Sequence, residues 1–501
     1  MPQRHHPLLI AGLILLQTTS WVLVPYFTLP NAPLDVIEGA VWGRQFELGY
    51  HKGPPLFAWA LGLGLQLLPG SMLPALLLSQ FSLGLAYWAV WRVARRLYGD
   101  DDALIVLLLM TTIYFYGFPS PEFNPIILQM AFSAIAGSFF YTALRDDRLR
   151  DWVIVGIAAG LGLLTRYSTA MYLVAMAVFV LLQPQARLCL KRPGPYLAAV
   201  ITLLIMLPHL YWLQNHNFVS FAYVDQRAGF SRGWNRVLLP VHFIGSQFLA
   251  LLPPLVLLLI GLGARSEPVV TAPRDNRFEK WFVIAIALGP VLLVVMLALI
   301  MGRTPRAMWG APLWIFATLL VPLLFSDKLS ATGRRWVARA WPVMFLLPLA
   351  LYASAMVVGP QVMNRNKRVH FPGQELARTV TDTWRRETGQ PLRFVAGQMW
   401  LTGNVVFYSS DRPQSFTAAS RIAAPWIDNA RLRQCGAMLL WPIALDEDEI
   451  PHNLAAAFPD ARLLPPLVLK PPPNALQHLP FRFGWAIAQP APGAAACPER
   501  R

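Results

Sequence analysis

The feature that most constrains this chain is a series of apolar runs that recurs along its first 360 residues. A helix needs about 20 mostly apolar residues to cross a bilayer, and most of these runs approach that length. Hydrophobic residues make up 55% of the 501 residues and charged residues only 14%, against about 25% charged in ordinary soluble domains. A water-soluble fold of this size could not cover its surface with so few charges. The sequence therefore predicts an α-helical polytopic membrane protein.

We expect eleven membrane spans. They are residues 8–26, 72–91, 103–118, 126–144, 152–164, 168–182, 196–213, 239–262, 281–301, 308–325 and 341–358. Lys and Arg concentrate in cytoplasmic loops, and the basic clusters near Arg92, Arg145, Arg187, Arg274 and Arg334 are assigned to that side. This orientation makes 152–182 a hairpin with Arg166 at its outer turn, and it makes 55–68 an interfacial helix. The N-terminus then lies in the cytoplasm.

The formal net charge of +16 does not indicate a nucleic-acid partner. The basic residues are spread over short loops between apolar runs and form no stripe with interleaved aromatic residues, which nucleic-acid binding would require. The charge instead fits contact with membrane lipids.

Beyond the last span the composition becomes more polar. We expect residues 1–358 to form the transmembrane domain and residues 359–501 a small α/β domain on the outer side of the membrane. Its expected strands are 392–396, 437–441, 463–470 and 481–488, and its expected helices are 374–386 and 447–458, the second interrupted by Pro451. Cys435 and Cys497 would share an oxidising compartment, so a disulfide between them is an open alternative.

The outer loops contain few charged residues, and these are clustered near helix ends. The residues considered for a site are Asp35, Glu38, His51 and Lys52 in the first loop, Glu122 in the second, Arg166 in the third, Arg232 in the fourth, and Arg303 and Arg306 in the fifth. They could form an ordinary solvated membrane face. Residues 35–48 also have the spacing of an amphipathic helix lying in the interface.

A carboxylate facing several cations suits group transfer from a phosphate. The acid can take a proton from the attacking group, and the cations can stabilise charge on the departing phosphate. Arg offers two parallel hydrogen bonds and Lys a point charge. The residue types therefore favour chemistry on a lipid-linked phosphate.

The first outer loop also carries a familiar pattern. Asp35-Val-Ile-Glu38, followed by Gly49-Tyr50-His51-Lys52-Gly53-Pro54-Pro55-Leu56, resembles the ArnT-like and protein-mannosyltransferase superfamily. These are membrane glycosyltransferases of the GT-C type that use polyprenyl-phosphate sugars. The resemblance runs through the whole chain and is greatest to the lipopolysaccharide glycosyltransferase branch.

The resemblance implies that Asp35 is the catalytic base or orients the acceptor, and that Lys52 contacts the donor phosphate. Glu38, His51 or Glu122 could assist Asp35, and Arg166, Arg232, Arg303 and Arg306 could share the phosphate. Two features depart from the ArnT pattern: Glu38 stands where that pattern has Arg, and His51 and Gly53 flank the lysine. No cofactor is assigned; a divalent metal stays open because some relatives bind one, although the histidines lack ligand spacing.

The resulting expectation is a hexosyl- or pentosyltransferase of the bacterial inner membrane. It would move a sugar from a polyprenyl-phosphate donor to lipid A or lipopolysaccharide core at the periplasmic face. Three alternatives stay open: a protein O-glycosyltransferase, a lipid or sugar transporter, and a scaffold that displays the outer domain. A transporter often has inverted repeats and polar or broken helices at mid-membrane depth, whereas no repeat is found here and charged residues lie at the ends of the expected spans. A scaffold would leave the clustered first-loop charges unexplained.

Overall fold

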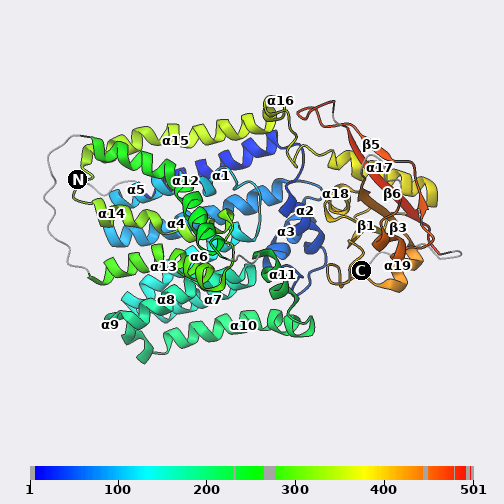
Figure 1. Ribbon diagram of the computed structural model, residues 1–501. Helices are drawn as coiled ribbons and strands as arrows, with labels where there is room; N and C mark the ends of the chain where they lie inside the picture. Colours follow the sequence, from blue (N-terminus) through cyan, green and yellow to red (C-terminus); the bar gives the residue numbers. More distant parts are fainter. Residues whose placement is uncertain are drawn as a thin grey trace. The chain divides into compact units, whose positions relative to one another are not determined.

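The computed structural model describes residues 6–228, 233–264, 277–443, 449–478, 480–491 and 497. They belong to two compact units, and Figure 1 labels most of their α-helices and strands. The first unit contains the chain up to Val24, Lys52–Leu56 and Leu76–Tyr352. The second contains Pro25–His51, Phe57–Ala75 and the chain from Ala353 onward. The second unit thus combines most of the first outer loop with the C-terminal segment. The division into a transmembrane domain of residues 1–358 and an outer domain of residues 359–501 stays a prediction.

The described part of the first unit is helical. Its elements are α1 (His6–Thr28, whose last turn belongs to the second unit), α4 (Leu73–Tyr98), α5 (Asp100–Thr111), η1 (Tyr114–Tyr116), α6 (Pro125–Asp146), α7 (Leu149–Thr165), η2 (Tyr167–Thr169), α8 (Ala170–Leu182), α9 (Pro184–Arg187), η3 (Leu188–Lys191), α10 (Gly194–Asn215), α11 (Val219–Ala228), α12 (Asn235–Gly263), α13 (Arg277–Met301), η4 (Ala307–Trp314), η5 (Ala317–Leu319), α14 (Leu320–Phe325) and α15 (Ala331–Val357).

The polytopic helical class predicted from the sequence is confirmed. Within the described residues, seven helices are long and apolar enough to cross a membrane: α1, α4, α6, α10, α12, α13 and α15. Two further predicted spans are bent helix pairs, Tyr167–Leu182 with Pro184–Lys191 at 99° and Ala307–Trp314 with Ala317–Phe325 at 49°. The other two predicted spans correspond to α5, with 12 residues, and α7, with 17. At 1.5 Å per residue, α5 is only about 18 Å long.

The expected hairpin over 152–182 is also present. Helix α7 ends at Thr165, and Arg166 adopts an extended conformation before η2 and α8 begin. Arg166 therefore lies at the turn, as the basic flanks of the hairpin predicted.

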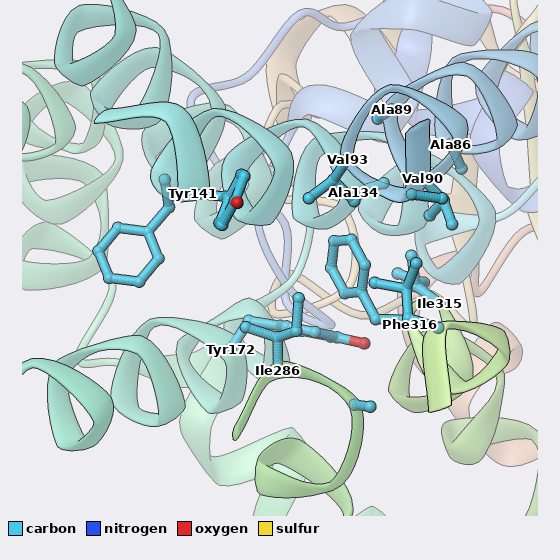
Figure 2. Close-up of a cluster of buried hydrophobic side chains, with 14 of the residues drawn as sticks. Ala86, Ala89, Val90, Val93, Ala134, Tyr141, Tyr172, Ile286, Ile315 and Phe316 are labelled. Atoms are coloured by element: carbon cyan, nitrogen blue, oxygen red, sulfur yellow. The ribbon is translucent and has the colours of Figure 1, made fainter. Parts of the chain in front are cut away.

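The core of the first unit is built from α4, α6, α8, α13 and the segment around η4 and η5 (Figure 2). Phe316 lies against the backbone of α6, where a Cβ atom added to Gly137 would stand 2.6 Å from its ring. Close contact of this kind matters in a bilayer, because lipid tails are as apolar as the helices and association depends on packing.

The broken span that contains η4 is stabilised by polar side chains of its neighbours. The hydroxyl of Tyr172 donates to the carbonyl of Pro312 at 2.6 Å, and that of Tyr116 donates to Ala311 at 3.1 Å. The amide of Gln247 donates to the carbonyl of Ala307 at 3.0 Å. Irregular backbone is tolerated at membrane depth only where protein groups satisfy it. These three side chains therefore satisfy carbonyls of η4, the segment that follows Arg303 and Arg306 in the chain.

The second unit consists of two helices from the first outer loop and a mixed C-terminal domain. Its elements are α2 (Leu34–Gly43), α3 (Leu56–Leu67), α16 (Gly359–Met363), α17 (Gly373–Thr388), β1 (Phe394–Gly397), α18 (Met399–Tyr408), β2 (Gln414–Thr417), α19 (Asn429–Cys435), β3 (Ala437–Pro442), α20 (His452–Ala457), β4 (Arg462–Leu463), β5 (Leu467–Leu469) and β6 (Phe481–Ala488). The sheet order is β2-β1-β3-β6-β4, with β5 also paired to β6. The β2-β1-β3 part is parallel and the pairs to β6 are antiparallel.

Most of the expected α/β elements are present. The strand expected at 463–470 is divided into β4 and β5 by Pro465 and Pro466, and β2 was not predicted. Of the helix expected at 447–458, the structure shows α20 after Pro451, and residues 444–448 lie outside the described residues. Cys435 and Cys497 form a disulfide with their Cα atoms 5.4 Å apart, so that alternative is confirmed.

Glycines allow α2 to approach two other helices closely. A Cβ atom at Gly43 would lie 2.3 Å from the carbonyl oxygen of Ala58 on α3, and one at Gly403 on α18 would lie 2.5 Å from Ile37. A larger residue at Gly43 would require movement of the backbone, and one at Gly403 would require Ile37 to shift. Helix α2 is thereby fixed between α3 and the C-terminal domain.

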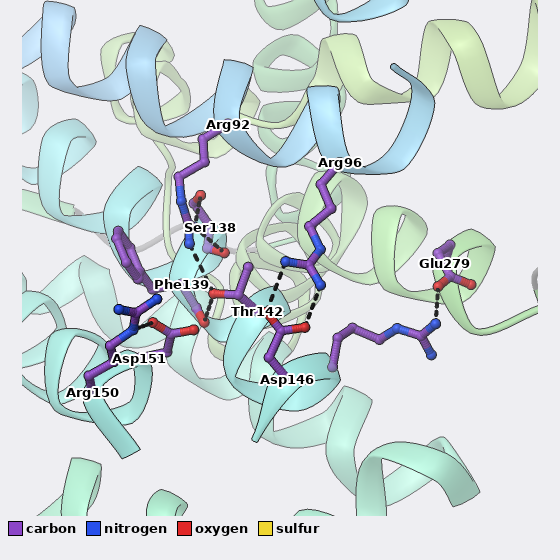
Figure 3. Close-up of polar contacts among 10 residues, drawn as sticks. Arg92, Arg96, Ser138, Phe139, Thr142, Asp146, Arg150, Asp151 and Glu279 are labelled. Carbon is purple, nitrogen blue, oxygen red and sulfur yellow. Dashed lines mark hydrogen bonds and ion pairs between the residues drawn. The ribbon is translucent and has the colours of Figure 1, made fainter. Parts of the chain in front are cut away.

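A polar network joins α4 to α6 at the end assigned to the cytoplasm (Figure 3). The guanidinium group of Arg92 donates to the side chains of Ser138 at 3.1 Å and Thr142 at 3.2 Å, and it lies 3.9 Å from the ring centroid of Phe139. Arg96 instead forms an ion pair with Asp146 at an exposed position.

We expect Arg92→Gln to destabilise the protein more than Arg96→Gln. Removing Arg92 leaves two partly buried hydroxyls without this donor, at a cost of about 1–3 kcal/mol, whereas an exposed ion pair contributes about 0–1 kcal/mol. Thermal unfolding of the two purified variants in one detergent measures the difference. Equal shifts of the melting temperature would contradict the assignment.

Candidate functional site

Two predicted acidic residues lie on one short helix of the second unit. Asp35 is in the first turn of α2 and is half-buried, and Glu38 follows three residues later with 9% of its surface exposed. Residues three apart lie on the same side of a helix, so α2 presents two carboxylates together. A carboxylate in the first turn is also favoured by the helix dipole.

The chain just before α2 is held by hydrogen bonds to α18. The amide of Asn31 donates to the side-chain oxygen of Asn404 at 3.0 Å, and the backbone N–H of Ala32 donates to the hydroxyl of Tyr408 at 3.0 Å. Burial raises the pKa of Tyr408 to about 12. The start of α2, and with it Asp35, is therefore fixed by groups far away in the sequence.

His51, which was predicted to assist Asp35, packs beside two stacked aromatic side chains of the first loop. Its ring meets Trp42 edge to face at a centroid distance of 5.8 Å. Trp42 in turn stacks on Tyr50 at 5.0 Å, and the hydroxyl of Tyr50 donates to the carbonyl of Trp42 at 2.8 Å. Burial raises the pKa of Tyr50. His51 therefore packs beside the stacked rings of Trp42 and Tyr50.

Three of the predicted phosphate-binding cations in the first unit meet at α11. The ammonium group of Lys52 lies 5.6 Å from the ring centroid of Tyr223. Arg303 forms an ion pair with Asp225 and also donates to its backbone carbonyl at 3.1 Å. The guanidinium group of Arg306 approaches the carbonyl of Arg227 at 3.5 Å. One short helix thus collects cations from the first and fifth predicted outer loops.

Arg166 is linked to the same region through aromatic neighbours. Its guanidinium group lies 5.9 Å from the ring centroid of Trp309, three residues after Arg306. Tyr167, the residue after Arg166, stacks on Phe221 of α11 at 4.9 Å. The hydroxyl of Tyr167 is 2.7 Å from Nε2 of His209. His209 is fully buried. Arg232 lies outside the described residues.

Glu122 does not sit within a helix. It precedes Asn124, whose side chain accepts hydrogen bonds from the N–H groups of Ile126 and Ile127 and donates to the carbonyl of Glu122. Asn124 is therefore the N-cap of α6, and Pro125 occupies the first helical position, where its missing N–H costs nothing. The second-loop motif has a clear structural role, and Glu122 is the half-buried carboxylate beside it.

The predicted site residues are divided between the two units. Asp35, Glu38 and His51 belong to the second unit, and Lys52, Glu122, Arg166, Arg303 and Arg306 belong to the first. Tyr223, Asp225 and Trp309, the partners of the cations, were not predicted as site residues. Tyr223 and Trp309 could have been identified by their closeness in the sequence to charged residues of the outer loops.

Within the described residues, no three His, Cys, Asp or Glu side chains come together in an arrangement that could hold a metal ion.

Comparison with known proteins gives a consistent result. Residues 52–212 match the dolichyl-phosphate-mannose-protein mannosyltransferase family. The chain is 24% identical to the lipopolysaccharide core galacturonosyltransferase RgtB of Rhizobium johnstonii, over 77% of this chain and 81% of that protein. It is 22% identical to the lipid A galacturonosyltransferase RgtD of the same organism, over 70% of each chain.

Among solved structures, the fold is similar to that of ArnT from Cupriavidus metallidurans bound to undecaprenyl phosphate. The TM-score is 0.58 at 16% identity, covering 97% of this chain and 99% of that one. The overall fold, from the membrane helices to the C-terminal sheet, is therefore shared.

We expect Arg303→Gln to loosen α11 more than Arg306→Gln does. The first change removes an ion pair and a hydrogen bond to Asp225, while the second removes only a long contact to a carbonyl. Hydrogen exchange of the amides in 219–228 measures local opening. A several-fold faster exchange is expected in Arg303→Gln alone. Unchanged exchange in both variants would show that α11 is held by other contacts.

Proposed function

We propose that this chain, a member of the ArnT-like and protein-mannosyltransferase superfamily of membrane glycosyltransferases, transfers a sugar from a polyprenyl-phosphate donor to lipid A or lipopolysaccharide core. The observation that carries the proposal is the gathering of Lys52, Arg303 and Arg306 at α11, with Arg166 linked to it. The similar galacturonosyltransferases act on lipopolysaccharide core and on lipid A.

The cations suit a donor whose phosphate stays at the membrane surface. Arginine can bind a phosphate through two parallel hydrogen bonds, and lysine adds a compact charge. The ArnT structure of similar fold contains undecaprenyl phosphate, a lipid with this head group. We assign Lys52, Arg166, Arg303 and Arg306 to the donor phosphate, and Arg232 as a further candidate.

Asp35 is assigned as the base in a single displacement. Its carboxylate accepts the proton of an acceptor hydroxyl, whose oxygen then bonds to the anomeric carbon of the sugar. The bond from that carbon to the phosphate oxygen breaks on the opposite side, so the configuration inverts. The electron pair remains on the polyprenyl phosphate, where the cations stabilise its charge. Glu38, His51 and Glu122 are candidates to assist.

We propose a hexosyl donor, because the two relatives named above are galacturonosyltransferases. We also propose that the chain lies in the inner membrane with its N-terminus in the cytoplasm. Residues 359–501, the proposed periplasmic domain, then share an oxidising compartment, which agrees with the disulfide between Cys435 and Cys497.

A protein O-glycosyltransferase is the second candidate function. The match of residues 52–212 to a protein mannosyltransferase family favours it. The two candidates differ in whether the glycolipid or the glycoprotein fraction loses sugar when the gene is deleted.

We expect Asp35→Asn to abolish transfer while protein levels stay near normal, because the amide cannot accept the proton. A deletion strain carrying each variant is tested by mass spectrometry of its lipid A and core, where the native protein restores a sugar-sized mass. Glu47→Gln in the same loop is the matched control and should restore it fully. Substantial modification by a stable Asp35→Asn protein would defeat the role of Asp35, and a sugar found only on proteins would favour the second candidate.

We expect Lys52→Ala to raise the KM for the donor about tenfold or more, with a smaller change in kcat, since it removes one charged contact to the phosphate. Tyr223→Leu should have a weaker effect of the same kind because it removes the ring beside the ammonium group. Tyr223→Phe retains the ring and serves as the control. A donor KM that is unaltered by Lys52→Ala would remove Lys52 from the site.

A further inference from the structure

The chain leaves its last long apolar helix through a short segment that is both apolar and basic. Helix α15, which is long and apolar enough to cross a membrane, ends at Val357, and α16 follows at Gly359–Met363. Residues 359–372 contain three cations, Arg365, Lys367 and Arg368, and no acidic residue. Because only a few residues separate these cations from the end of a membrane span, they must lie near the bilayer surface.

Helix α16 exposes two large apolar side chains beside the first cation. Val362 is 78% exposed and Met363 is 69% exposed. Asn364 then adopts a left-handed conformation, and the backbone N–H of Arg365 donates to the carbonyl of Pro360 at 3.2 Å. At a bilayer surface, apolar side chains of this kind can enter the lipid while neighbouring cations stay among the head groups.

The loop that carries the cations is attached to α15 by buried hydrogen bonds. His370 is fully buried, and its Nδ1 accepts from the backbone N–H of Lys367 at 3.2 Å. Its Nε2 therefore carries the proton and donates to the carbonyl of Met356 of α15 at 2.8 Å. The side chain of Asn366 also accepts from the backbone N–H of Leu476 at 2.9 Å. The backbone between α16 and α17 is thus held in one conformation.

This ordered loop leaves its arginines at the surface. Arg365 and Arg368 are exposed, and Lys367 is half-buried. The guanidinium group of Arg368 lies 5.9 Å from the ring centroid of Trp400. Because the backbone is already fixed, little further ordering is needed when these side chains bind a ligand.

A second apolar helix ends beside the same loop. The side-chain amide of Asn474 donates to the carbonyl of Met356 at 3.3 Å and approaches that of Thr28, the last residue of α1, at 3.5 Å. Tyr26 and Phe27 in the last turn of α1 are exposed, with their ring centroids 5.3 Å apart. Aromatic residues at the end of a span are typical of the membrane–water interface. The ends of α1 and α15 therefore mark one level, that of the bilayer surface.

We propose that residues 359–372 bind anionic phospholipid at this surface. Val362 and Met363 enter the bilayer, and the cations Arg365, Lys367 and Arg368 contact lipid phosphates. Basic residues next to a span are attracted to anionic lipids, and arginine can bind a phosphate through two parallel hydrogen bonds.

A lipid fits this segment better than a second copy of the chain does. The segment is continuous with a membrane span, and the same basic segment of another copy would repel it. The inference goes beyond the proposed function, because it concerns how the C-terminal domain is held at the membrane and requires no sugar transfer. Helix α17 follows the loop directly, so lipid contact here restrains the start of that domain.

The test measures hydrogen exchange of the amides in residues 359–370. The purified full-length protein is placed in nanodiscs of phosphatidylcholine alone or of phosphatidylcholine with phosphatidylglycerol. We expect several-fold slower exchange with phosphatidylglycerol, because bound head groups oppose local opening. High salt should remove the difference, since it screens exposed charges. Arg365→Gln/Arg368→Gln should remove it as well.

The matched control is Arg433→Gln/Arg482→Gln, which removes the same charge from exposed residues of α19 and β6. This variant should retain the lipid effect. Val362→Ser/Met363→Ser should exchange faster than the native protein in both bilayers, because polar side chains no longer favour entry into lipid. Near-identical thermal unfolding of all variants shows that the substitutions leave the fold intact.

Three results would overturn the proposal. One is equal exchange of the native protein in the two bilayers, and another is an unchanged lipid effect in Arg365→Gln/Arg368→Gln. The third is protection in lipid-free detergent that increases with protein concentration, which would indicate a second copy as the partner. Absence of sugar transfer in cells would refute the proposed function and leave the lipid result standing.

Discussion

The cost of charge inside a bilayer governs the arrangement of the first unit. A charged side chain at the centre of a membrane helix costs about 3 kcal/mol or more, so charges are found near the ends of the helices. Arg92 and Arg96 lie near one end of α4 and contact α6. Lys52, Arg303 and Arg306 gather at α11. A phosphate attached to a polyprenyl chain is under the same constraint, because its charge must stay at the surface while its tail stays in lipid. The cost of charge in the bilayer interior therefore keeps both the phosphate of the ligand and the cations of the protein at the membrane surface.

The apolar interior of a membrane also limits where the backbone can depart from a regular helix. The segment η4 departs from the regular α-helical ladder, and Tyr116, Tyr172 and Gln247 supply donors to its carbonyls at Ala311, Pro312 and Ala307. Without these donors the carbonyls would be unsatisfied in an apolar surrounding. The loop between α13 and η4 contains Arg303 and Arg306, which contact α11. Apolar packing, buried tyrosines and surface cations are therefore parts of one arrangement rather than separate features.

Much of this fold could be predicted from the sequence, and the reason is local. Apolar run length and basic flanks identified the helices, and they placed Arg166 at the turn of its hairpin. What could not be predicted depends on contacts between distant segments. Sequence periodicity gives no sign that Asn31 bonds to Asn404 or that the α2 segment packs on α18. Likewise, Tyr223 became a candidate partner of Lys52 only through the fold. The eleven expected spans were predicted from the lengths of apolar runs. The length of such a run does not reveal that the helix within it, α5, has only 12 residues.

The residues assigned to the donor phosphate and the residue assigned as the base are held by different contacts. Lys52, Arg303 and Arg306 lie at α11 of the first unit. Asp35 lies in the second unit, on a helix whose start is fixed by the hydrogen bonds of Asn31 and Ala32 to α18. In the proposed single displacement, phosphate binding and proton transfer therefore depend on separately stabilised elements.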